Sequence, residues 1–315
     1  MTFLRGDLEP FREAPTDQFR MLVLLSCELS CIAGELRAMI LATVQSSASR
    51  CRVPWERRNL QLITRNLAPL TRTLTRMIDY SKIASEYAKH RQVHPRVLEN
   101  LISEGNIGSA STVLEVGCGT GNYVGSLNQL TGCSCYGIDP SEEMLSNAKK
   151  RFPLVAFRAG KAEKVDFDSD YFDLVFSVDV IHHVADRPSY LREAYRTLKR
   201  GGRICTVTDS EWIIRNRQPL SFYFPETVDE ELKRYPSVRQ MMDSMRAAGF
   251  RETDERMAEF PYKLTDLSGY RSKVFSSLLL ISDGAFKRGL KRMEEDLAKG
   301  PIPCVSRYSL LWGIK

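Results

Sequence analysis

The sequence predicts an α/β fold: a doubly wound, seven-stranded sheet with an antiparallel last strand and helices on both faces. Three observations predict it. Strand-like and helix-like runs alternate between residues 112 and 208, a glycine-rich loop follows the first of these strands, and two further strand-like runs come near the end of the chain. Because such alternation requires right-handed crossovers, we expect the sheet to be mostly parallel.

The alternating part supplies five strands and three helices. The strands are expected at residues 112–116, 135–138, 155–158, 172–177 and 203–208, and the helices between them at 122–130, 141–151 and 188–198. Two more helices are expected before the first strand, at 80–90 and 94–104, since a first helical turn tolerates Pro95.

Beyond residue 208 the alternation breaks. Residues 211–243 begin with an aromatic-rich stretch that fits neither the helical nor the strand period, and we interpret them as a cap inserted over a binding site. A helix at 238–248 should end at Gly249, a good left-handed stop. Helices around 267–280 and 283–297 then separate the last two strands, 251–260 and 306–312, which are expected to close the sheet at an antiparallel edge.

Composition excludes several classes of protein. No apolar run reaches the ~20 residues of a membrane span, and the charged first twenty residues do not form a secretory signal, so we expect a cytoplasmic location. The eight cysteines are scattered, which favours reduced thiols and no metal. The net charge is +6, and the 45 basic residues are dispersed, so nothing indicates a nucleic-acid partner.

The glycine loop is the main functional signal. Gly117, Gly119 and Gly121 let the backbone turn tightly and approach a ligand at the first crossover, where doubly wound sheets bind ligands. A nicotinamide-binding loop would read G-x-G-x-x-G, but here the third glycine comes one residue early. Glu115 would repel a pyrophosphate and would suit a cationic amino or sulfonium group. These residues favour S-adenosylmethionine as the cofactor.

Residues 115–121, E-V-G-C-G-T-G, resemble motif I of the class I S-adenosylmethionine-dependent methyltransferases, whose sheet is Rossmann-like. The resemblance runs in the family's order from about residue 80 to 208. It implies that Asp139 accepts hydrogen bonds from both ribose hydroxyls, a task that suits a carboxylate with two oxygens. It also implies that Pro140 and Met144 pack against the adenine.

Three later segments extend the resemblance. Residues 160–163, G-K-A-E, occupy the place of G-D-A-E, so Lys161 replaces the acid that usually binds the adenine amino group, and the amide of Ala162 remains available to the ring. The resemblance also implies cofactor contacts for Glu163 and for Ser177, in the fourth motif. Residues 198–202, L-K-R-G-G, match the turn L-K-P-G-G with arginine in place of proline.

The segment before residue 93 resembles the ubiquinone and menaquinone methyltransferases. Tyr80, Tyr87 and Arg91 follow their Y…A…Y…R pattern. In that interpretation an aromatic ring closes over the cofactor and Arg91 pairs with its carboxylate. The alternative is an ordinary amphipathic helix with an exposed arginine.

Residues 1–76 have a separate composition, with eleven arginines and no lysine, whereas all fourteen lysines lie from Lys82 onward. We interpret them as a helical or poorly ordered extension, and residues 77–315 as a methyltransferase domain with the cap at 211–243. The alternatives are a targeting segment, which the early acidic residues argue against, or a start codon placed too far upstream of Met77. A chain beginning at Met77 is expected to fold and to bind cofactor.

His182 and His183 are the candidate catalytic residues. They are adjacent at the end of a strand and therefore point in different directions, so one can face the methyl donor. A histidine there can accept a proton from an oxygen or nitrogen nucleophile near neutral pH. Positioning alone is the alternative, because many methyl transfers gain most from in-line geometry.

The sequence therefore predicts an S-adenosylmethionine-dependent methyltransferase that acts on a small-molecule acceptor by direct methyl displacement. Two alternatives remain, a tRNA methyltransferase and a non-catalytic S-adenosylmethionine-binding regulatory protein, for which Lys161 is the sequence hint. Arsenite methylation is disfavoured because the cysteines lie far apart. The accepting atom and the oligomeric state stay open.

Overall fold

A computed structural model of the chain describes residues 93–315. The extension at 1–76, the helix expected at 80–90, and the candidate residues Tyr80 and Arg91 lie outside these described residues. Within residues 93–315, no helix is both long and apolar enough to cross a membrane.

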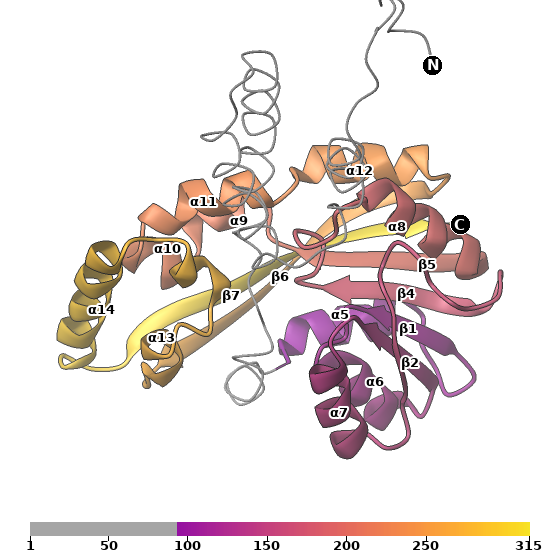
Figure 1. The fold of residues 1–315 in the computed structure, drawn as a ribbon, viewed down its shortest axis with the longest axis horizontal. Helices are drawn as coiled ribbons and strands as arrows, with labels where there is room; N and C mark the ends of the chain where they lie inside the picture. The colour runs from indigo at the N-terminus through magenta and orange to yellow at the C-terminus, as the bar shows by residue number, and fades with distance from the viewer. Residues whose placement is uncertain (1–92) are drawn as a thin grey trace, which may run out of the picture. The chain divides into compact units, whose positions relative to one another are not determined.

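The described part of the chain is organised around a seven-stranded sheet with the order β3-β2-β1-β4-β5-β7-β6 (Figure 1). The strands are β1 Thr112–Val116, β2 Ser134–Asp139, β3 Ala156–Ala159, β4 Phe172–Val178, β5 Leu198–Thr208, β6 Arg251–Leu264 and β7 Ile302–Ile314. Strands β1 to β5 pair in parallel, and β7 pairs antiparallel with both β5 and β6. The predicted fold class is confirmed. The last strand of the chain lies inside the sheet, and β6 forms the edge.

Helices cover both faces of this sheet. They are α5 Pro95–Glu104, α6 Asn122–Thr131, α7 Glu142–Arg151, α8 Arg187–Thr197 and α12 Val238–Ala247. Figure 1 shows α5, α6 and α7 on one side of the strands and α8 and α12 on the other. This arrangement is the doubly wound one, and it follows from the alternation of strands and helices along the chain.

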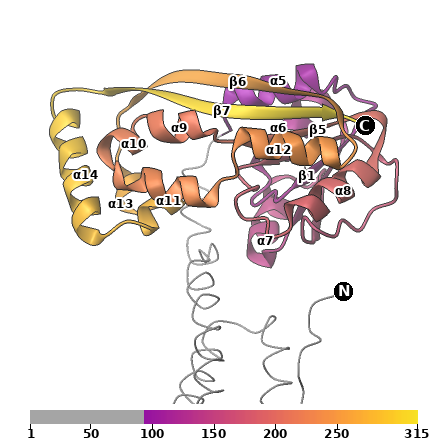
Figure 2. The same ribbon diagram turned by 90° about the horizontal axis from the view of Figure 1, so that it is seen from above.

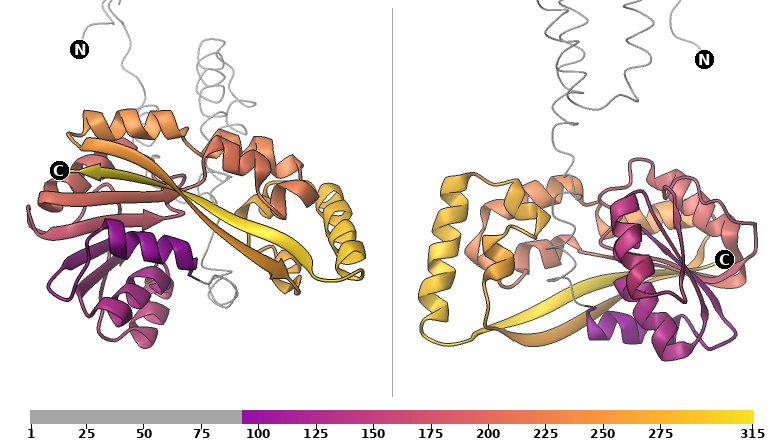
Figure 3. Two further views of the ribbon diagram at one scale, coloured as in Figure 1. Left: turned by 180° about the vertical axis from the view of Figure 1, so that it is seen from behind. Right: turned by 60° about the horizontal axis from the view of Figure 1, so that its bottom comes forward.

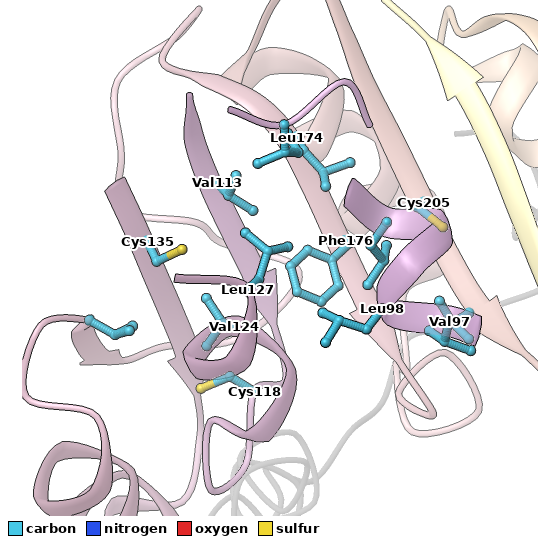
Figure 4. Close-up of a cluster of buried hydrophobic side chains, with 14 of the residues drawn as sticks. Val97, Leu98, Val113, Cys118, Val124, Leu127, Cys135, Leu174, Phe176 and Cys205 are labelled. Carbon is cyan, nitrogen blue, oxygen red and sulfur yellow. The ribbon is translucent and has the colours of Figure 1, made fainter. Parts of the chain in front are cut away.

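The two faces have separate hydrophobic cores. Neighbouring strand residues point to opposite faces, so Val113 packs in one core and Leu114 in the other. Figure 4 shows the first core, in which Val113 and Phe176 from the strands meet Leu98 of α5 and Leu127 of α6. Burial of central strands on both faces explains why they read as continuous apolar runs in the sequence.

The helices that cover the sheet begin and end within one residue of the predicted positions, and side-chain caps set several of these boundaries. Ser141 accepts a hydrogen bond from the Met144 N–H at 3.3 Å and therefore precedes α7 instead of opening it. Ser237 and Gln240 form a reciprocal capping box at the start of α12. Gly249 follows α12 at a φ of 108°, the left-handed stop that the sequence predicted.

The segment after β5 folds into three short helices, α9 Glu211–Asn216, α10 Leu220–Tyr223 and α11 Glu226–Arg234. A second segment, between β6 and β7, contains α13 Ser268–Arg271, a 3₁₀ turn at Ser276–Leu279 and α14 Asp283–Leu297. The single helix expected around 267–280 was therefore wrong, because that stretch is broken into two short turns.

We call helices α9 to α11 and residues 265–301 the cap lobe. Strands β6 and β7 are longer than the sequence predicted, and Figures 2 and 3 show them running as a hairpin from the sheet to α13 and α14. The lobe has its own hydrophobic core, built around Phe224, Tyr270 and Met293. The cap predicted at 211–243 thus supplies only part of this lobe, since the other part comes from the insertion between β6 and β7.

Candidate functional site

The glycine loop lies at the carboxyl end of β1, where its three glycines all have positive φ angles. A Cβ on Gly117 would lie 2.5 Å from a methyl carbon of Val180, and one on Gly121 would lie 2.7 Å from the ring of Phe157. A Cβ on Gly119 would meet nothing within 4 Å. Two of the glycines are therefore required by packing, whereas Gly119 borders open space that a ligand can use.

Glu115 lies beneath this loop, with only 3% of its surface exposed. Its carboxyl oxygen accepts a hydrogen bond from the Val124 N–H at 2.9 Å, in the first turn of α6. Burial raises the pKa of Glu115 to about 8, although this hydrogen bond acts in the opposite direction. In the protein alone, Glu115 is therefore largely protonated at neutral pH, and a nearby cation would restore its charge.

Asp139 joins the end of β2 to the glycine loop. One of its carboxylate oxygens accepts from the Gly119 N–H at 2.9 Å, and the other accepts from the Ser141 N–H at 2.8 Å. Burial raises the pKa of Asp139 above its ordinary value against these two bonds. The structure thus brings Asp139 and Gly119 together. Pro140 beside them is exposed, and Met144 is buried at the start of α7.

The segment after β3 contains Ala162 and Glu163. Ala162 is half-buried and Lys161 is exposed. Glu163 accepts hydrogen bonds from the N–H groups of Ala185 and Asp186 at 3.2 and 3.5 Å. Glu163 therefore ties its segment to the loop that follows β4.

Ser177 is placed differently from the other candidates. It is buried in β4, and its hydroxyl accepts a hydrogen bond from Tyr190 of α8 at 3.1 Å. Tyr190 belongs to the core between the sheet and α8. In the structure, the Ser177 side chain therefore faces the helix layer on that side of the sheet.

His182 and His183 lie in a turn after β4, and their ring centroids are 4.0 Å apart. His182 is half-buried and stacks on Tyr235, with 4.2 Å between ring centroids and an interplanar angle of 22°. His183 is exposed. The two histidines thus occupy different environments, one against the residue that follows α11 and the other at the surface.

A charged cluster next to this turn was not found by sequence reasoning. The guanidinium of Arg217 binds the carboxylate of Asp209, just after β5, and that of Glu231 in α11, the latter at 3.1 Å. Burial, followed by Asp209 and Asp179, raises the pKa of Tyr235 well above its ordinary value. The one available signal was the acid directly after each of the strands β4 and β5, namely Asp179 and Asp209.

Asp179 ends β4 in a left-handed conformation, with a φ of 56°. Its carboxylate accepts a hydrogen bond from the Tyr308 hydroxyl at 3.0 Å. A residue other than glycine in this conformation is uncommon, and such residues concentrate at functional sites. In residues 93–315, no group of three or more His, Cys, Asp or Glu side chains is arranged to hold a metal ion.

Comparison with known proteins agrees with this geometry. Residues 114–206 match the family model described as a methyltransferase domain. A demethylmenaquinone methyltransferase from Chlorobaculum tepidum is 35% identical over 111 residues, which cover 35% of this chain and 45% of that protein. Another from Oceanobacillus iheyensis is 27% identical over 184 residues, covering 50% of this chain and 77% of the relative.

Among solved structures, one described as a methyltransferase from an antibiotic biosynthesis pathway of Anabaena variabilis superposes with a TM-score of 0.55. It is 21% identical and covers 71% of this chain and 99% of its own, so the likeness is one of fold. The chain spans less than half of the length of the Chlorobaculum relative, and the residues that match the family model contain the glycine loop and Asp139. Residues 114–206 therefore match a methyltransferase domain, the described part of the chain has the Rossmann-like methyltransferase fold, and the chain is similar to class I S-adenosylmethionine-dependent methyltransferases of the quinone type.

Proposed function

We propose that this chain binds S-adenosylmethionine at the glycine loop and transfers its methyl group directly to a small-molecule acceptor. The observation that carries the proposal is the contact between Asp139 and the Gly119 N–H at 2.9 Å. It sets a carboxylate beside the one loop glycine that borders open space. A carboxylate at the edge of a glycine cradle suits a ligand with vicinal hydroxyls and an adjacent cationic group.

The residues that would hold the donor come from three consecutive strand ends. Asp139 has lone pairs left to accept from the ribose hydroxyls. The adenine would be bordered by Pro140, Met144 and the amide of Ala162. Glu163 would hold the segment after β3, which contains Ala162, in place. Glu115 would face the cationic end of the donor through the loop, while Tyr80 and Arg91 would close over it from the preceding segment.

When bound, the donor supplies a methyl group activated by a positively charged sulfonium. The task of the protein is then to align the acceptor with that methyl group, since in-line positioning provides much of the rate. An acceptor that carries a proton must also lose it. Either His183 or His182 would take that proton. His183 is exposed, whereas His182 is half-buried and stacks on Tyr235.

The acceptor is proposed to be a small molecule. Support comes from the names of several curated relatives, which include demethylmenaquinone and tocopherol methyltransferases. Transfer to tRNA is less well supported, because the basic residues are dispersed along the chain and form no basic-aromatic cluster in the sequence. A purely regulatory binding protein is supported only by Lys161.

Calorimetry on the full chain tests donor binding. S-adenosylmethionine and S-adenosylhomocysteine should both bind, and NAD should not. If neither sulfur ligand binds, the proposed function is wrong, and tight binding of NAD would favour a dehydrogenase instead.

Methyl transfer is tested with donor labelled in its methyl group. The acceptors are a set of quinols, phenols and sterols, with bulk tRNA as a separate sample. Label should enter an extractable small molecule and not RNA. Substituting the histidine that acts as base should slow transfer by about 100-fold or more at neutral pH. Equal rates for His182→Ala, His183→Ala and the natural chain would leave positioning as the mechanism.

A further inference from the structure

Arg187, the first residue of α8, connects two segments that are distant in the sequence. Its Nε donates a hydrogen bond to the carbonyl oxygen of Ile181 at 3.1 Å. Its Nη2 donates to the carbonyl oxygen of Arg234 at 3.2 Å. The same edge of the guanidinium therefore binds a main-chain carbonyl of the turn after β4 and a main-chain carbonyl of α11 in the cap lobe.

Each of these carbonyl groups belongs to the residue directly before one of two stacked aromatic residues, His182 and Tyr235. Ile181 precedes His182 in the turn after β4, and Arg234 precedes Tyr235 at the end of α11. The two rings stack at 4.2 Å. Arg187 thus holds both backbones at the place where the stack begins.

The position of Arg187 is not explained by the needs of its own helix. A cation in the first turn of a helix is disfavoured by the helix dipole. The start of α8 is already capped by Asp186, whose carboxylate accepts from the Ser189 N–H at 3.0 Å. The carboxyl end of α11 offers the opposite situation. The last carbonyl groups of that helix lack partners within the helix, and the helix dipole favours a cation beside them. The contacts of Arg187 are therefore explained by α11 and the histidine turn.

Arg217 supplies a second connection on the same side of the cap lobe. It binds Asp209 after β5 and Glu231 in α11. Arg187 connects the last turn of α11 to the turn after β4, and Arg217 connects Glu231 of α11 to the end of β5. Two arginines thus fix this helix against the strand ends where a doubly wound sheet binds ligands.

We infer that Arg187 is a positioning residue that couples the placement of cap helix α11 to that of the turn carrying His182 and His183. The inference rests on the proposed function, in which these histidines face the acceptor. An arginine suits this task because its planar edge presents two parallel donors, whereas a lysine presents a single ammonium. The hydrogen bonds of Arg187 go to Ile181 and Arg234 and not to the glycine loop or Asp139, so we expect the coupling to affect the acceptor more than the donor.

Hydrogen exchange on the full chain tests the coupling directly. The variants are Arg187→Ala and Arg187→Lys, and the matched control is Arg192→Ala, an exposed residue of the same helix that contacts Ser189. In both Arg187 variants, amides of residues 181–186 and 231–235 should exchange about fivefold faster or more, because each segment loses a hydrogen bond to a charged donor. The control should leave both segments protected. Unchanged exchange at 231–235 in Arg187→Ala would overturn the inference.

Binding and transfer provide the second readout. In Arg187→Ala, the affinity for S-adenosylmethionine should change much less than kcat/KM for the acceptor found in the labelled assay, which should fall about tenfold or more. Adding Arg187→Ala to His182→Ala should cost little further rate, and additive losses would contradict an action through the turn. If the natural chain binds neither sulfur ligand, the proposed function fails, and the exchange experiment still decides whether Arg187 couples the two segments.

Discussion

The carboxyl group of Glu115 accepts a hydrogen bond from the Val124 N–H at 2.9 Å, so the acid before the glycine loop binds the helix after it. The loop is thereby closed from below by Glu115 and held at its open side by Asp139, through the Gly119 N–H. Two buried acids fix one loop from different sides, and their substitutions should have different effects.

Replacing Glu115 should change how the stability of the ligand-free protein depends on pH. Its pKa is about 8 in the folded protein and ordinarily 4.5. The stability that it contributes is therefore fully present below pH 4.5 and is lost as the pH rises through 8. Glu115→Gln keeps an acceptor for Val124 without this loss, and at pH 9 it should exceed the natural chain in unfolding free energy by ~2–5 kcal/mol.

Urea unfolding at pH 5.5 and pH 9 measures this effect. Glu295→Gln serves as the control, because Glu295 is exposed on α14. If the natural chain and Glu115→Gln lose stability equally between the two pH values, Glu115 does not hold a proton in the folded protein.

Replacing Asp139 should weaken donor binding. Asp139→Ala removes the carboxylate proposed to bind the ribose and frees the Gly119 N–H, so the affinity for S-adenosylmethionine should fall more than about tenfold, as for loss of a charged hydrogen bond. Calorimetry measures it. Asp170→Ala is the control, since Asp170 pairs with Lys315 at the amino end of β4. An unchanged affinity in Asp139→Ala would show that the ribose assignment is wrong.

Alanine substitutions at two glycines with similar backbone conformations should distinguish the effect of backbone strain from the effect of ligand contact. Gly119 has a φ of 53° and Gly201 a φ of 78°, and an added Cβ would meet nothing within 4 Å at either position. Alanine at either site should cost ~1–2 kcal/mol of stability through its left-handed conformation. Only Gly119→Ala should also lose S-adenosylmethionine binding, because its methyl group would enter the proposed site. Thermal unfolding and calorimetry together give the result, and equal binding by the two variants would remove Gly119 from the site.

Removing the cation of the charged cluster should destabilise the protein. Arg217→Met leaves Asp209 and Glu231 buried without their counter-ion, which should cost ~3–5 kcal/mol in unfolding free energy. Adding Asp209→Asn and Glu231→Gln should recover much of the loss, because the buried charges are then gone. Arg215→Met, an exposed neighbour in α9, is the control for chemical unfolding. A loss no larger than that of the control would show that the cluster contributes little.

The sequence predicted the elements between residues 94 and 208 to within one residue, except that β5 begins at Leu198 instead of residue 203. Strands buried on both faces, such as Thr112–Val116, are largely apolar runs, and the helices after β2 and β4 begin at capping side chains, Ser141 and Asp186. The cap lobe gave a weaker signal. Its helix Leu220–Tyr223 has four residues, too few to show a helical period. Strands β6 and β7 continue as a two-stranded hairpin past the end of β5, and β6 is mostly exposed.

The sequence by itself determined the glycine loop, Glu115 and Asp139, because these depend on local spacing and on neighbouring parallel strands that end at one edge of the sheet. Only the tertiary structure decided that Arg217 binds Asp209 and Glu231, and that His182 stacks on Tyr235. These contacts join strand ends to cap helices far along the chain. They depend on how the cap lobe packs, and no periodic pattern in the sequence encodes that packing.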